Sequence, residues 1–235
     1  MEKINSLYFH YRFIKDSQMI TFNVKLDPQS LDYILQIPRD NPQWTRLDYM
    51  VCDNCPLHNT DAVYCPVAVN LVDVVEAFKD TLSYDVVDVL VEIRERTYAR
   101  QQIPIQQALS SLLGIIMVTS GCGSLDKLRP MVRFHLPFAS IEETVFRVAS
   151  TYLLAQYFRV RKGLQPDWEM KHLVSIYQNI ARININICKR LQQATSKDAS
   201  LNAVVILDTF AQMMPLTIEE TLKDFEHLFT PYIKE

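Results

Sequence analysis

The sequence predicts an α+β protein, in which an N-terminal antiparallel sheet of three or four strands is followed by a C-terminal helical bundle. Apolar and polar residues alternate in several segments of the first hundred residues, which is typical of half-buried strands. Beyond residue 103, apolar residues recur every three or four positions, as in amphipathic helices. Strands followed by helices is the order of an α+β fold. No Gly/Ser linker separates residues 1–102 from 103–235, so we expect the mainly β half, with its cysteine-rich loop, and the helical half to pack as one unit.

Four segments of the first half have the alternation of strands. Residues 7–13 and 20–26 flank a short polar stretch, which predicts a β-hairpin. A third strand is predicted at 45–49, running directly into the cysteines. In 86–96, valine and isoleucine occupy every second position and charged residues most of the others. That pattern predicts a further strand with one face buried.

Start and stop signals divide the rest of the chain into helices. Asp27-Pro28 and Cys65-Pro66 each place proline in a first helical turn, and Ser140 with Glu143 forms a capping box. A short helical turn after Gly123 should end at Pro130. The sequence predicts a short helix over 28–36 and longer ones over 66–78, 104–118, 140–163 and 166–191. A last helix should begin at 199, break at Pro215 and restart at Thr217.

Composition excludes several classes of function. Only four glycines occur, and neither the dinucleotide-binding nor the P-loop glycine pattern can be written from their positions. The formal net charge is -3, with acidic and basic residues mixed along the chain, which disfavours a nucleic-acid partner. The chain opens without the long apolar run of a signal peptide, and no uncharged apolar run of 18 residues occurs. We therefore expect a cytoplasmic protein with no membrane partner.

Three of the five cysteines are crowded into one short segment. Cys52 and Cys55 have the C-x2-C spacing, and Cys65 follows nine residues later. Cytoplasmic cysteines stay reduced, so a cluster of them indicates metal ligands or redox thiols rather than disulfides. The C-x2-C spacing lets two thiolates bind one centre, and it occurs in both zinc and iron–sulfur sites.

Cys122 is the preferred fourth ligand. It lies between Gly121 and Gly123, and glycine would let the backbone pass close to a metal without a Cβ clash. His58, three residues after Cys55, is the rival and would complete a Cys3His zinc site. Cys188 lies within a predicted apolar helix and is expected to be an inert core residue.

The predicted function is to bind a metal through Cys52, Cys55, Cys65 and Cys122, with a structural role. Spacing leaves zinc and an iron–sulfur cluster both open, although the two Cys-Pro pairs favour the cluster slightly. One alternative is a thiol-dependent enzyme, with Cys122 as nucleophile and His135 as base. Another is a metal-free interaction module that binds a protein partner or a second copy of the chain.

Four motifs together resemble a bacterial protein family of unknown function. They are Cys52-Asp-Asn-Cys55-Pro56-Leu57, Tyr64-Cys65-Pro66-Val67-Ala68, Thr119-Ser120-Gly121-Cys122 and Arg133-Phe134-His135-Leu136-Pro137-Phe138. The resemblance covers about residues 45 to 190. It implies a full-length bacterial cytosolic protein whose four cysteines belong to one motif set, and it implies no catalytic residue.

Overall fold

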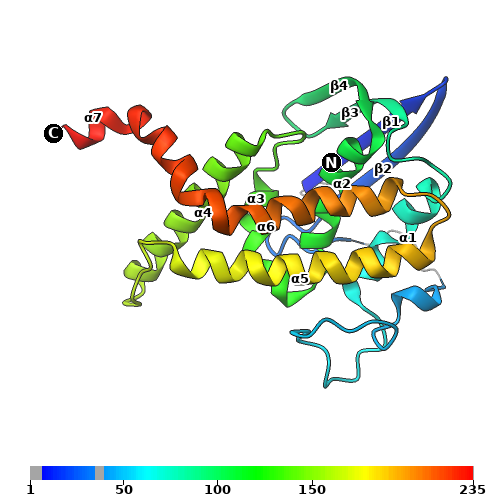
Figure 1. Cartoon of the computed structure of the whole chain (residues 1–235), viewed down its shortest axis with the longest axis horizontal. Helices are drawn as coiled ribbons and strands as arrows, with labels where there is room; N and C mark the ends of the chain where they lie inside the picture. Colours follow the sequence, from blue (N-terminus) through cyan, green and yellow to red (C-terminus); the bar gives the residue numbers. More distant parts are fainter. Residues whose placement is uncertain (1–6, 35–39, 235) are drawn as a thin grey trace, which may run out of the picture.

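A computed structural model describes residues 7–34 and 40–234, and it confirms the α+β fold. The sheet has four strands, each antiparallel to its neighbours, in the order β2-β1-β3-β4. The strands are β1 (Leu7–Lys15), β2 (Gln18–Leu26), β3 (Val86–Glu92) and β4 (Thr97–Pro104). The two long helices of the C-terminal half lie beside the sheet and the helices packed on it (Figure 1).

The predicted hairpin forms because its apolar alternation matches the pleat of a strand. Phe9, Tyr11 and Phe13 of β1 are buried on one face, and Tyr11 pairs with Phe22 of β2 and with Val91 of β3. The opposite face carries polar side chains such as those of the Arg12–Glu92 ion pair, whose closest N···O distance is 2.5 Å. Burial of alternate residues therefore fixes the register of the central strand pair.

Helices make up most of the remaining chain. The α-helices are α1 (Pro66–Phe78), α2 (Ile105–Val118), α3 (Arg129–Arg133), α4 (Ile141–Arg161), α5 (Lys171–Ala194), α6 (Ala199–Phe225) and α7 (Thr230–Ile233). The 3-10 helices are η1 (Gln43–Thr45), η2 (Gly123–Leu128) and η3 (Glu226–Phe229). The predicted capping box starts α4: the Ser140 hydroxyl accepts from the Glu143 N–H, and the Glu143 carboxylate accepts from the Ser140 N–H.

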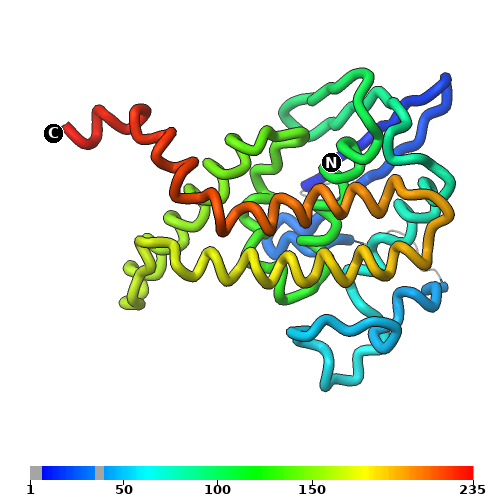
Figure 2. The backbone as a smooth tube through the Cα atoms, in the orientation of Figure 1, coloured from blue at the N-terminus to red at the C-terminus, as the bar shows by residue number. Residues whose placement is uncertain are grey.

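The core lies between the sheet and the helices that cover its apolar face. Phe78 of α1 packs against Phe13 with ring centroids 5.2 Å apart, and the hydroxyl of Tyr11 lies 2.8 Å from that of Ser111 in α2. Helices α5 and α6 run side by side in opposite directions, and both contact α1 (Figure 2). One cluster of buried residues includes strands of the first half and helices of the second.

The predicted helix at 28–36 is wrong for the part that the structure describes. Residues 28–30 form a turn, because the Asp27 carboxylate accepts from the N–H groups of Gln29 and Ser30 at 2.9 and 2.8 Å. Leu31 then has φ +60°, which takes the chain out of the helical region. Tyr33 pairs with Leu26 as an isolated bridge. Residues 35 and 36 lie outside the described part.

The predicted strand at 45–49 is also wrong. The 3-10 helix η1 ends at Thr45, and turns follow over residues 47–49. Three carbonyls of this region, those of Trp44, Arg46 and Leu47, accept hydrogen bonds from the side chain of Arg190 in α5. These bonds hold the segment in turns against α5, and its strand-like pairing is limited to the Arg46–Tyr64 bridge. The fourth strand of the sheet is instead β4.

Two prolines lie inside helices that they were predicted to end or interrupt. Pro130 is the second residue of α3, where the missing N–H would have no helical partner. Pro215 lies within α6, which continues past it, and the Thr217 hydroxyl donates to the Met213 carbonyl at 3.2 Å. Met214 and Ile218 are buried on the two sides of this proline, so packing stabilises the helix where propensity opposes it.

By length and composition, the helical stretch Ala199–Ile233 could cross a membrane, as could many core helices of globular proteins. The bent pair Ile105–Val118 and Gly123–Arg133 passes the same test when it is taken as one segment. Within the first stretch, Ala203, Val204 and Ala211 are buried in the core, on a helix that packs against α2 and α5.

Candidate functional site

The four cysteines singled out in the sequence line one small cavity. Cys52 and Cys55 come from the loop between η1 and α1, Cys65 directly precedes α1, and Cys122 directly precedes η2. Three side chains of α5 complete the wall, those of Ile183, Ile187 and Arg190. The cavity measures about 20 Å³. Cysteines up to seventy positions apart in the sequence therefore line the same cavity.

Backbone hydrogen bonds hold the loop that carries the first three cysteines. The N–H of Cys55 donates to the Cys52 carbonyl at 3.0 Å, which closes a turn between the two thiols. The N–H of Cys65 donates to the Thr45 carbonyl at 2.8 Å, and Leu47 donates to Val63 at 2.8 Å. Both ends of the loop are thus held together, and Cys65 lies at the N-terminus of a 13-residue helix.

Asn70 joins the segment of Cys65 to the segment of Cys122. Its side-chain nitrogen donates to the carbonyl of Pro66 at 2.9 Å and to that of Ser120 at 3.2 Å. The side chain is buried on the first turns of α1, so few other donors could satisfy the Ser120 carbonyl. This bond between two distant segments brings Cys122 to the same cavity as the other thiols.

Glycine is favoured at position 121 by the backbone conformation there, and not by a lack of space for a side chain. Gly121 has φ +89°, which side chains other than glycine rarely adopt, and this turn leads the chain from the end of α2 to Cys122. A Cβ at Gly121 would meet no atom within 4 Å, and one at Gly123 would lie 3.9 Å from Asp126 Oδ2. Within the protein itself, neither glycine is therefore required by close packing, and their expected approach to a metal stays a prediction.

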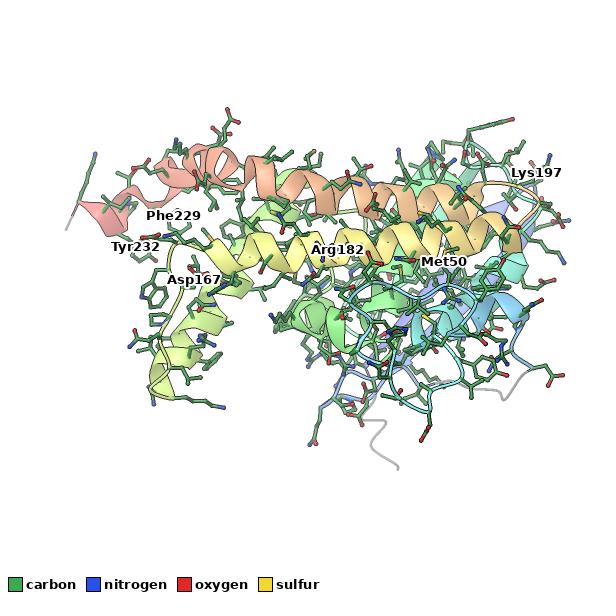
Figure 3. All side chains as sticks on the ribbon, turned by 60° about the horizontal axis from the view of Figure 1, so that its bottom comes forward. Met50, Asp167, Arg182, Lys197, Phe229 and Tyr232 are labelled. Atoms are coloured by element: carbon green, nitrogen blue, oxygen red, sulfur yellow. The ribbon has the colours of Figure 1, made fainter. Side chains whose placement is uncertain are left out.

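Arg190 is the charged residue of this site, and the sequence analysis missed it. It is buried, and its guanidinium donates to the carbonyls of Trp44, Arg46, Leu47 and Met50, at 2.5, 2.7 and 3.4 Å for the first three. Figure 3 shows Met50 in the loop beside α5. Arg190 thus ties the cysteine loop to α5 and adds a positive charge to the cavity wall. A charged residue on the apolar stripe of Ile183 and Ile187 was the sequence signal for it.

The electrostatics of the cavity keep the thiols of Cys52 and Cys122 protonated. Burial, and to a smaller extent the neighbouring thiols of Cys65, Cys55 and Cys122, raise the pKa of Cys52 to about 12, while Arg190 acts in the opposite direction. Burial also raises the pKa of Cys122 to about 11, although its sulfur accepts a hydrogen bond from the Ser124 N–H. Several thiolates in one small cavity repel one another, so only a bound cation would hold them all deprotonated.

The thiols surround the cavity without converging on one ion. Across residues 7–34 and 40–234, no three His, Cys, Asp or Glu side chains lie close enough together to hold a single metal ion. All five cysteines are free thiols. A four-coordinate zinc ion would need its sulfurs about 2.3 Å from the metal and therefore about 3.8 Å from one another.

The other residues considered from the sequence lie outside this cavity. His58 is exposed and does not line it. Nε2 of His135 lies 3.0 Å from the Tyr11 hydroxyl and 3.2 Å from that of Ser111, and this histidine lines a different cavity from Cys122. Cys188 is partly buried against the core and also lies outside the cavity of the four cysteines. A nucleophilic Cys122 would need a lowered pKa, and burial raises it.

Comparison with known proteins identifies a family without an assigned activity. The family model named "Domain of unknown function (DUF6901)" matches residues 7–230, which include the sheet, the cysteine cavity and nearly all of the helical region. No curated protein and no solved structure matches the chain.

Proposed function

The chain belongs to the DUF6901 family, and we propose that its function is to bind a metal centre through the thiolates of Cys52, Cys55, Cys65 and Cys122. The observation that carries this proposal is the cavity that all four cysteines line. Chance burial would scatter cysteines through the core, as it does Cys188. Four thiols from three separate segments around one cavity match the number and kind of ligands of a four-cysteine metal site, which supports the proposal.

The form of the centre that we propose is an iron–sulfur cluster. Among the described residues, no three His, Cys, Asp or Glu side chains are placed to hold a single ion, so a closed zinc site is not preformed here. The two Cys-Pro pairs favour a cluster, whose cysteines bind different iron atoms, and the cavity of about 20 Å³ would have to widen to admit it. Arg190 and the Ser124 N–H would offset the negative charge of such a centre and its thiolates.

The role that we propose for the centre is structural. Its ligands come from the loop before α1, from the start of α1 and from the segment after α2, and α5 forms the remaining wall. A metal bound there would connect the loop at residues 46–65, which has little regular structure of its own, to the helical layer. Metal binding that replaces missing core contacts is common in loop-rich segments.

The test is metal analysis of protein purified without oxygen. We expect iron and acid-labile sulfide close to stoichiometric with the chain, and an absorption band near 400 nm. Replacing Cys65 or Cys122 by serine should remove most of the iron, because each ligand is needed to hold the centre. The matched control is Cys188→Ser, which alters a cysteine outside the cavity and should keep full metal content.

The outcomes separate the parts of the proposal. Stoichiometric zinc that depends on the same four cysteines would support the four-cysteine site and overturn the iron–sulfur assignment. Protein with five titratable thiols and no metal after anaerobic purification would overturn the proposal. So would iron that Cys188→Ser removes as readily as Cys122→Ser.

A further inference from the structure

Another cavity in the described part of the chain is much larger than the one lined by the cysteines. It measures about 450 Å³, within the range of small-molecule binding sites. Its walls come from α2, η2, α3, α4, α5, α6 and the segment between α3 and α4. Most of the lining is apolar, including Ile115, Leu128, Met131, Ile180, Leu207 and Phe210. An open apolar cavity of this size is costly for a protein to keep unless something fills it.

The polar groups of this cavity have unused hydrogen-bond donors. Arg147 of α4 lines it, and one guanidinium nitrogen, Nη2, donates to the carbonyls of Met131 and Phe134 at 2.7 and 3.1 Å. Among the residues that the structure describes, Nε and Nη1 of Arg147 have no hydrogen-bond partner, and no carboxylate forms an ion pair with it. Burial lowers the pKa of Arg147, as expected for a guanidinium withdrawn from water.

Asn184 of α5 is the second unsatisfied group. Its side chain is 2% exposed, it lines the same cavity, and its amide nitrogen has no partner. A buried donor without a partner costs about 1 to 3 kcal/mol, so leucine of similar shape would stabilise the empty protein. The asparagine is therefore unfavourable for folding alone, which is typical of a residue that serves a ligand.

We infer that this cavity binds a small molecule with an apolar chain and a carboxylate. The apolar walls suit the chain, and the unpaired guanidinium of Arg147 together with the Asn184 amide suits an anionic acceptor. A carboxylate would pair with the charge of Arg147, and an acceptor oxygen within reach of Asn184 would satisfy its amide, whereas a cationic head group would be repelled by Arg147. The site is separate from the cysteine cavity, and the inference goes beyond the proposed metal centre.

Calorimetric titration of the purified full chain tests this inference, with decanoate below its micellar concentration as the probe. We expect saturable binding of one decanoate per chain. Decylammonium, which has the same chain length and the opposite charge, should bind at least tenfold more weakly. Replacing Arg147 by methionine or Asn184 by leucine should weaken decanoate binding roughly tenfold to a hundredfold, as for a lost hydrogen bond to a charged group.

Asn184→Leu separates binding from folding. Because it removes an unsatisfied buried amide, it should raise the midpoint of thermal unfolding while it lowers decanoate affinity. Two control variants alter the same helices outside the cavity: Arg161→Met in α4 and Asn186→Leu in α5. Both should bind decanoate as the unaltered protein does. Failure of decanoate to bind, equal affinity for the two ions, or unchanged binding by Asn184→Leu would overturn the inference.

Discussion

His135 is the residue whose protonation should govern stability in mild acid. Burial lowers its pKa to about 3, from an ordinary value near 6.5, and the charge of Arg147 acts in the same direction. The unfolded chain therefore binds a proton more readily than the folded one. The stabilisation due to neutral His135 is complete above about pH 6.5 and is lost as pH falls toward 3. At pH 5 we expect a loss of about 2 kcal/mol from this residue.

Chemical denaturation at several pH values measures this effect. His135→Gln should unfold with a weaker pH dependence between pH 7.5 and 5, because glutamine does not titrate. Exposed His58 provides the control, and His58→Gln should keep the pH dependence of the unaltered protein. If the free energy of unfolding varied with pH in the same way for His135→Gln and the unaltered protein, the pH dependence could not be assigned to His135.

Arg190 is the residue whose loss should damage the cysteine loop most. Methionine at this position would leave the carbonyls of Trp44, Arg46, Leu47 and Met50 without their donor. We expect Arg190→Met to lower the free energy of unfolding by at least about 3 kcal/mol, measured from urea midpoints, and to reduce the metal content. Arg182→Met, on an exposed turn of the same helix (Figure 3), should change stability by less than about 0.5 kcal/mol. Equal effects of the two changes would exclude the anchoring role of Arg190.

At the scale of elements, sequence patterns predicted the helices and strands that local interactions stabilise. The first hairpin, α1, α2 and α5 follow apolar periodicity, and the Ser140 capping box marks the start of α4. Thr97–Pro104 escaped prediction because β4 exposes most of its side chains and so lacks a buried alternation. At 45–49 the alternation was present, but a side chain more than 140 positions away takes the carbonyls that a strand would need. No local pattern contains that information.

Part of the candidate site could likewise be predicted from local sequence, and part depends on tertiary contacts. The density of cysteines and the position of Cys122 between two glycines pointed to the four thiols that line the cavity. Asn70 and Arg190 join the segments around it, and each lies on an otherwise apolar helix stripe where a polar residue stands out. Which distant carbonyls they bind depends on tertiary contacts, so the sequence could indicate unusual positions without naming their partners.

At the scale of the molecule, the proposed centre would connect the loop at residues 46–65 to the helical layer, and its removal should loosen that loop first. The sheet and the helices that cover it have an apolar core of their own, so they should stay folded without metal. Bound metal stabilises by about 4 kcal/mol when its free concentration is 1000 times Kd, and a chelator would remove that contribution. Hydrogen exchange with and without chelator measures the change amide by amide.

We expect faster exchange after metal removal at the amides of Cys55 and Cys65, which donate to carbonyls within the loop and in the η1 region. Amides of the β1–β3 ladder should keep their protection, because their hydrogen bonds lie in the buried sheet. The effect should also depend on pH: buried thiols with raised pKa values must lose protons to bind metal, so acid should weaken binding and alkali should strengthen it. Uniform loss of protection across sheet and loop would show instead that the whole fold depends on the metal. Unchanged exchange in the loop would show that no metal is bound at the cysteine cavity.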